Sequence, residues 1–78
     1  MNNEPVWKKI ITKEQGKCGG KPCIRGLRIR VIDILGMLAA GMSREDILAD
    51  FTNLTSDDIT ACIEYSIDKL EHLQEKAA

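Results

Sequence analysis

The sequence contains no long hydrophobic run, which bears first on whether the chain meets a membrane. Its longest apolar stretch, VIDILGMLAA, is interrupted by Asp33 and is far too short to cross a bilayer. The first residues, MNNEPVWKK, lack the apolar segment of a secretory signal. We therefore expect a soluble, cytoplasmic protein without membrane contact. Its 78 residues indicate a single domain, residues 1–78, of modest stability.

The sequence is also short of residues that build metal or catalytic sites. His72 is the only histidine, no CxxC or HxxxH pair occurs, and neither a Ser/His/Asp set nor a P-loop is evident. We therefore expect no metal, no cofactor and no enzymatic activity. The cysteines are three, Cys18, Cys23 and Cys62, and an odd number argues against a disulfide framework. We expect Cys62 to be a small core residue and the other two to be incidental loop thiols.

The net charge of −1 conceals a strong asymmetry along the chain. Residues 1–30 carry eight lysines and arginines against two glutamates, a net charge of +6. Residues 31–78 carry three cations against ten carboxylates, a net charge of −7. A basic front of this kind is typical of contact with a polyanion. The alternative is that the two halves attract each other, within one chain or across a dimer.

Helical periodicity begins near Val31. Apolar residues recur at positions 31, 34, 35 and 38, and Gly41 suits the left-handed conformation that ends a helix. Two similar stretches follow, MSREDI and LTSDDI, each with a hydroxyl residue as N-cap and an aspartate three residues later. They predict a short helix over about 44–51, a turn at 52–54 and a long third helix over about 56–75. We therefore expect a mostly α fold, with a homeodomain-like trihelical bundle of the helix-turn-helix type over residues 31–76.

Residues 1–30 are expected to form a basic extended arm or β-hairpin. VWKKIIT, residues 6–12, has the β-branched and aromatic content of a strand. IRGL at 24–27 predicts a tight turn with positive φ at Gly26, flanked by very short strands at 22–24 and 28–30. A ribbon this small is unstable alone, so it should lean on the helices or on the 6–12 strand of its own or another subunit.

The third helix is too long for the other two to cover. About twenty residues at 1.5 Å each extend roughly 30 Å, beyond the reach of the shorter helices. The apolar side chains near its end are therefore expected to contact a second subunit or another protein; they are Ile67, Leu70 and Leu73. The alternative is a frayed C-terminus.

The stretch GGKPCIRGLRIRVIDILGMLAAGMSREDILADF, followed by DDITACIEYS, resembles domain-of-unknown-function family 433, a set of small bacterial and archaeal proteins. The resemblance covers about residues 10–66, and the chain departs from the usual pattern at Leu27, Arg30 and Thr52. It implies a homeodomain-like trihelical fold with an extended N-terminal arm, often dimeric. Many members are regarded as antitoxins of the VapB type, paired with PIN-like ribonuclease toxins.

The resemblance and the basic arm together favour an antitoxin of a type II toxin–antitoxin pair. Such a protein binds and inhibits a PIN-like ribonuclease, with repression of its own operator as a second role of the arm. The predicted partner- or nucleic-acid-binding residues are the cations Lys17, Lys21, Arg25, Arg28 and Arg30. They would neutralise DNA phosphates, or an arginine such as Arg25 would enter the carboxylate cluster of the nuclease. Major-groove reading by the third helix is disfavoured because its first turn, Ser56-Asp57-Asp58, is acidic.

Two alternatives stay open at this point. In the first, the protein is a dimeric protein-interaction module that inhibits a nuclease without touching DNA, which the acidic second half favours. In the second, residues 16–30 form a solvated hairpin loop that caps the bundle and packs Ile24 and Ile29 inward. The second arrangement is compatible with arginines that face outward from the same loop.

Overall fold

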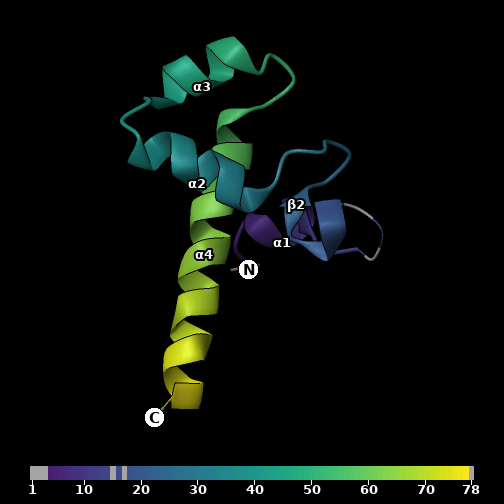
Figure 1. Ribbon diagram of the computed structural model, residues 1–78, viewed down its shortest axis with the longest axis vertical. Coiled ribbons are helices and arrows are strands. Elements are labelled where there is room, and N and C mark those ends of the chain that lie inside the picture. The colour runs from purple at the N-terminus through teal and green to yellow at the C-terminus, as the bar shows by residue number, and fades with distance from the viewer. Residues whose placement is uncertain (1–3, 15, 17, 78) are drawn as a thin grey trace.

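The computed structural model describes residues 4–14, 16 and 18–77. In chain order the elements are α1 (Trp7–Ile10), β1 (Ile11–Thr12), a 3-10 turn η1 (Cys18–Gly20), β2 (Cys23–Ile24), α2 (Val31–Ala39), α3 (Arg44–Asp50) and α4 (Ser56–Ala77). The fold is mostly helical with a short antiparallel β-hairpin near the N-terminus, as the sequence predicted (Figure 1). Over the described residues, none of the helices has both the length and the apolar character needed to traverse a bilayer.

The two predicted helix starts are confirmed by reciprocal capping hydrogen bonds. At α3, the Asp46 N–H donates to Ser43 Oγ at 3.1 Å, and the Ser43 N–H donates to a carboxylate oxygen of Asp46 at 3.0 Å. At α4, the Asp58 N–H donates to Thr55 Oγ1 at 3.3 Å, and the Thr55 N–H donates to a carboxylate oxygen of Asp58 at 2.9 Å. Gly41 follows α2 with φ +98°, in the left-handed conformation expected at the helix end. These local signals therefore place the helix boundaries to within about two residues.

The core lies where α2 and α3 pack on the first half of α4. Ile34 of α2, Ile47 of α3 and Ile59 of α4 have no exposed surface. Burial of a side chain of this size stabilises the fold by about 1.5–3 kcal/mol. Cys62, three residues after Ile59 on the same helix, is equally buried, which confirms its predicted place in the core.

The hairpin and the N-terminal segment differ from the prediction. β1 pairs with β2 in antiparallel register, with Ile11 opposite Ile24 and Thr12 opposite Cys23, so the ribbon leans on its own chain. However, Trp7–Ile10 is a helical turn, and the predicted strand over residues 6–12 is wrong for most of its length. The predicted pairing of 22–24 with 28–30 is confirmed in part, by an antiparallel β-bridge between Cys23 and Arg30. The Ile24 N–H donates to the Ile29 carbonyl at 2.9 Å, and the Val31 N–H to the Pro22 carbonyl at 3.1 Å.

The second half of α4 extends beyond the other helices (Figure 1). The helix has 22 residues, which at 1.5 Å per residue gives about 33 Å. The bundle covers its first half, and the segment coloured yellow continues past α1 and α2. This geometry leaves the apolar residues of the distal half exposed to solvent.

Candidate functional site

The turn of the basic arm is held rigidly by backbone hydrogen bonds. The Leu27 N–H donates to the Ile24 carbonyl at 3.0 Å, and Gly26 has φ +75°, which confirms the predicted tight turn. On the other side, the Arg25 N–H donates to the Ile10 carbonyl at 2.8 Å. Ile24 itself is only 2% exposed. The turn is therefore anchored both to the core and to the end of α1.

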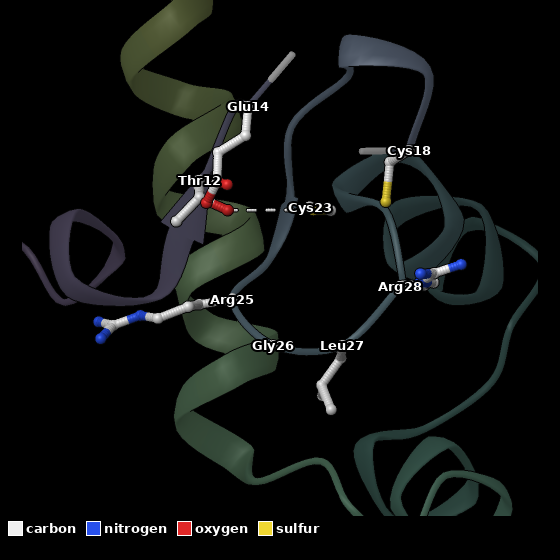
Figure 2. A pocket seen from close by; sticks show the side chains of 8 residues that line it. All are labelled: Thr12, Glu14, Cys18, Cys23, Arg25, Gly26, Leu27 and Arg28. Carbon is white, nitrogen blue, oxygen red and sulfur yellow. Dashed lines mark hydrogen bonds between the residues drawn. The ribbon is translucent and has the colours of Figure 1, made fainter. Parts of the chain in front are cut away.

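Two arginines leave this turn on opposite sides of the loop (Figure 2). Both line a shallow pocket of about 380 Å³ beside the turn, and both residues are exposed. In the view of Figure 2, the Arg25 side chain points away from the pocket, and Arg28 lies across the loop from it. Among the side chains that the structure describes, no carboxylate forms an ion pair with either guanidinium. Arg25 and Arg28 therefore present solvated positive charge on a fixed backbone.

Arg30, the last cation of the predicted site, is engaged inside the chain. Its Nη2 lies 2.8 Å from Asp33 Oδ1, its Nε 3.1 Å from Asp33 Oδ2, and its backbone N–H donates to the same oxygen at 3.1 Å. Hydrogen bonding to the Arg30 side chain holds the pKa of the Asp33 carboxyl below its usual range. The pair closes the first turn of α2 in the manner of a capping box. The structure therefore separates Arg30 from the outward-facing arginines of the turn.

Of the two lysines of the predicted site, the structure describes Lys21, which does not line the pocket beside the turn. Lys17 lies outside the described residues. Lys21 is exposed, and it borders a second, largely apolar groove between α2 and α4. Of the four predicted cations that the structure describes, only Arg25 and Arg28 therefore lie on the turn, and their side chains leave it on opposite sides.

An aromatic cluster that the sequence did not reveal attaches the N-terminal segment to α4. The rings of Trp7 and Tyr65 meet edge to face, with centroids 5.0 Å apart and an interplanar angle of 81°. Lys69 Nζ lies 5.6 Å from the Trp7 ring centroid and 5.1 Å from that of Tyr65. The backbone N–H of Trp7 donates to a carboxylate oxygen of Glu64 at 3.2 Å. The only sequence signal was the presence of the two aromatic residues, and nothing local indicated that they would meet.

The apolar residues predicted as an interface are exposed along the distal half of α4. Ile67, Leu70 and Leu73 are 54%, 61% and 62% exposed. Leu70 also lines the groove of about 380 Å³ between α2 and α4. On the α2 side of this groove Ile32 is 58% exposed, a residue that sequence reasoning missed. Ile32 is next to the apolar stripe of α2 in the sequence but does not belong to it. An apolar residue outside the stripe was the available sequence signal of an exposed apolar surface.

The burial of the cysteines differs in part from the expectation. Cys23 is only 4% exposed within β2, so its description as an incidental loop thiol is wrong. Cys18 is half-buried and lines the pocket beside the turn together with Cys23. Burial raises the pKa of the Cys62 thiol to about 12. In the part of the chain that the structure describes, no three histidine, cysteine or acidic side chains are grouped so as to hold a metal ion.

Comparisons with known proteins place the chain in a family without an assigned activity. Residues 11–66 match the family described as protein of unknown function (DUF433). Among solved structures, the chain is similar to a DUF433 member protein from Anabaena variabilis ATCC 29413, with 29% sequence identity and a TM-score of 0.74. The similarity covers 85% of this chain and 65% of that protein, so this chain spans about two thirds of the length of the solved protein. No curated protein matches the sequence.

Proposed function

The chain belongs to the DUF433 family, and from this premise we propose that it is an antitoxin that binds and inhibits a PIN-like ribonuclease toxin. In this proposal the protein is cytoplasmic and has no enzymatic activity of its own. The family resemblance suggests the class of partner. The observation that carries the proposal is the pair of outward-facing arginines on the turn of the arm.

Arg25 and Arg28 suit an acidic partner for a physical reason. A guanidinium is planar and always charged, and it donates two parallel hydrogen bonds to a carboxylate. The turn that carries Arg25 is fixed by hydrogen bonds to Ile10 and Ile24, so little backbone entropy is lost on binding. An arginine delivered in this way would pair with the metal-binding carboxylates of a nuclease and exclude the metal or the RNA phosphate.

The alternative function is a dimeric protein-interaction module that does not bind DNA. One observation favours it over operator binding. The helix-turn-helix region, residues 43–58, carries Arg44 against five carboxylates, Glu45, Asp46, Asp50, Asp57 and Asp58. Arg44 itself donates to the carbonyl and hydroxyl oxygens of Ser56, at 3.0 Å each. A surface with this charge is repelled by phosphates, so any contact with DNA is left to the arm.

The direct test is co-expression with the product of the adjacent open reading frame. We expect the two chains to co-purify and the neighbour's ribonuclease activity to be suppressed in the complex. Arg25→Ala/Arg28→Ala should weaken binding by at least about tenfold, since loss of paired charges typically costs this much or more. Lys8→Ala/Lys13→Ala removes the same charge from two exposed positions of the N-terminal segment and serves as the matched control.

The outcomes of this test are distinct. Full recovery of the complex with the double arginine variant would refute the role of the turn. Loss of helical circular dichroism in that variant would show that the arginines are structural. Binding to operator DNA is measured separately at about 50 and 200 mM salt, over which contacts to phosphates lose orders of magnitude in affinity. Absence of such binding, with inhibition of the nuclease intact, would select the module that does not bind DNA.

The same proposal includes a homodimer formed through the distal half of α4. Leu70 and Ile32 border an apolar groove whose rim carries Lys21 and Lys69. The exposed stripe of α4 alternates with acidic residues such as Asp68 and Glu71, so the helix of a second copy complements the groove in both hydrophobicity and charge. In a twofold-symmetric dimer each subunit contributes both the groove and the helix, so the same contact occurs twice.

Leu70→Asp tests the dimer. It should shift the mass measured by light scattering from dimer to monomer, because it places a charge within the apolar contact. Ala49→Asp, on the exposed side of α3, adds the same charge elsewhere and should leave the mass unchanged. A mass that is the same for wild type and Leu70→Asp would refute this interface.

A further inference from the structure

The pocket beside the turn brings two thiols together. Cys18 and Cys23 both line it, one from the η1 turn and the other from β2 (Figure 2). In Figure 2 the Cys18 sulfur points into the space enclosed by the loop. The nearby Cys23 thiol raises the pKa of the Cys18 thiol above its ordinary value. Cys18 is half-buried and reachable from solvent, whereas Cys23 is 4% exposed.

The backbone at Cys18 adopts an unusual conformation that produces this approach. Its φ is +51°, and it is the only non-glycine residue with positive φ in the described part of the chain. Gly19 and Gly20 continue in the left-handed region, with φ +66° and +77°, and the Lys21 N–H donates back to the Cys18 carbonyl at 3.2 Å. The left-handed region is unfavourable for a residue with a Cβ atom by roughly 1–2 kcal/mol. The fold nevertheless holds Cys18 there, at the pocket that Cys23 also lines.

We propose that Cys18 and Cys23 form a dithiol site that undergoes exchange with low-molecular-weight disulfides. The thiolate of Cys18 attacks one sulfur of the small disulfide and releases one small thiol, which leaves a mixed disulfide at Cys18. The Cys23 thiol then loses its proton and attacks the Cys18 sulfur, which releases the second small thiol. One small disulfide is reduced to two thiols while the two protein thiols are oxidised to one internal disulfide. The proposal does not depend on the antitoxin function.

The environments of the two cysteines indicate which one attacks the small disulfide and which one resolves the mixed disulfide. Cys18 is the attacking residue because it is accessible, and the charges of Arg28 and Arg30 favour its thiolate. The neighbouring Cys23 thiol and partial burial act more strongly in the opposite direction and raise the pKa of Cys18 above its ordinary value. The first step therefore accelerates as the pH rises. Cys23, shielded from bulk reagents, resolves the mixed disulfide.

Cys62 provides an internal reference for the experiment. It has no exposed surface, and burial raises the pKa of its thiol to about 12. It should stay reduced in the folded protein while the other two cysteines react.

The experiment treats the reduced, folded chain with glutathione disulfide and quenches with acid. We expect the titre of thiols, measured after denaturation, to fall from three to one per chain. The chain should lose about 2 Da, the mass of the two hydrogens removed on formation of an internal disulfide. Trypsin digestion should place this loss in the peptide 18–25, since the Lys21–Pro22 bond resists cleavage and both cysteines stay together.

Single variants separate the two roles. Cys23→Ser should stop at a stable mixed disulfide with glutathione on Cys18. Cys18→Ser should lose the reaction, and Cys62→Ser should still form the internal disulfide. A mixed disulfide that accumulates on the wild-type chain without an internal bond would overturn the proposal, as would disulfide-linked dimers as the main product.

A second measurement asks whether the fold itself favours the bond. The equilibrium constant for oxidation by glutathione disulfide is determined in buffer and again in denaturant. If the native geometry is predisposed to the disulfide, the native constant should be at least about tenfold larger, equivalent to roughly 30 mV for this two-electron couple. A native constant equal to or smaller than the one in denaturant would mean that the fold does not favour the bond, and would refute the proposal even if oxidation is observed.

Discussion

The contact between Trp7 and Tyr65 should carry a measurable part of the stability of the fold. Their edge-to-face geometry, with centroids 5.0 Å apart, lies in the range worth about 0.5–1.5 kcal/mol beyond simple burial. Lys69, within 6 Å of both ring centroids, adds about 0.5–1 kcal/mol at an exposed site of this kind. Because Lys69 contacts both rings, only part of its contribution counts toward the coupling free energy between Trp7 and Tyr65. We therefore expect a coupling free energy of about 1 kcal/mol between Trp7 and Tyr65.

A double-mutant cycle measures this coupling. Trp7→Leu, Tyr65→Leu and the double variant are unfolded in urea and followed by circular dichroism. In thermal unfolding, a loss of about 1 kcal/mol in Tyr65→Leu should lower the unfolding temperature by about 4–8 °C in a domain of this size. Tyr65→Phe preserves the ring and is the control that should retain the coupling.

Tryptophan fluorescence provides an independent readout, because Trp7 is the only tryptophan. In Tyr65→Leu the emission of Trp7 should move to longer wavelengths as the ring becomes hydrated, while helical content is retained. A coupling free energy below about 0.3 kcal/mol, within the scatter of additive substitutions, would refute the view that these rings hold α1 against α4.

Two further predictions concern the arm and the helix that follows it. Asp33 has a lowered pKa because of Arg30, so its contribution to stability is present above the unfolded value of about 4 and is lost as the pH falls through the folded value. Asp33→Asn should therefore be less sensitive than wild type to a change from about pH 6 to about pH 2.5 in urea unfolding, and equal sensitivity would contradict the ion pair. Gly26→Ala should cost about 1–2 kcal/mol because φ is +75°, whereas Gly36→Ala, in α2, should stabilise by about 0.5–1 kcal/mol. Neither added Cβ atom meets another atom within 4 Å, so two changes of equal sign in thermal unfolding would contradict the backbone explanation.

Much of the helical part was predictable because its signals are local. The pairs Ser43 with Asp46 and Thr55 with Asp58 satisfy backbone N–H groups within their own helix starts, and so they act wherever the helix lies. Gly26 was predictable for a similar reason, since only its own φ had to be positive. In each case the residues that determine the structure are neighbours in sequence.

The parts that could not be predicted depend on partners far apart in the chain. Residues 6–12 have the composition of a strand, but Trp7 packs on Tyr65, 58 positions away, and this tertiary contact accompanies a helical turn. Arg30 is the exception, because it was misassigned although its partner is close in sequence. Its partner Asp33 is only three residues away, and a cation that precedes a first-turn aspartate was a signal of an internal pair.

The position of α1 has a consequence for any molecule that engages the protein. This single helical turn touches the arm through the hydrogen bond from Arg25 to the Ile10 carbonyl. It touches α4 through the aromatic cluster, whose members Tyr65 and Lys69 also border the groove. A ligand that displaces α1 from the arm would therefore also shift the residues that border the groove. Thermodynamic linkage is reciprocal. If a ligand at the arm changes the affinity of the groove by some factor, a ligand in the groove changes the affinity of the arm by the same factor.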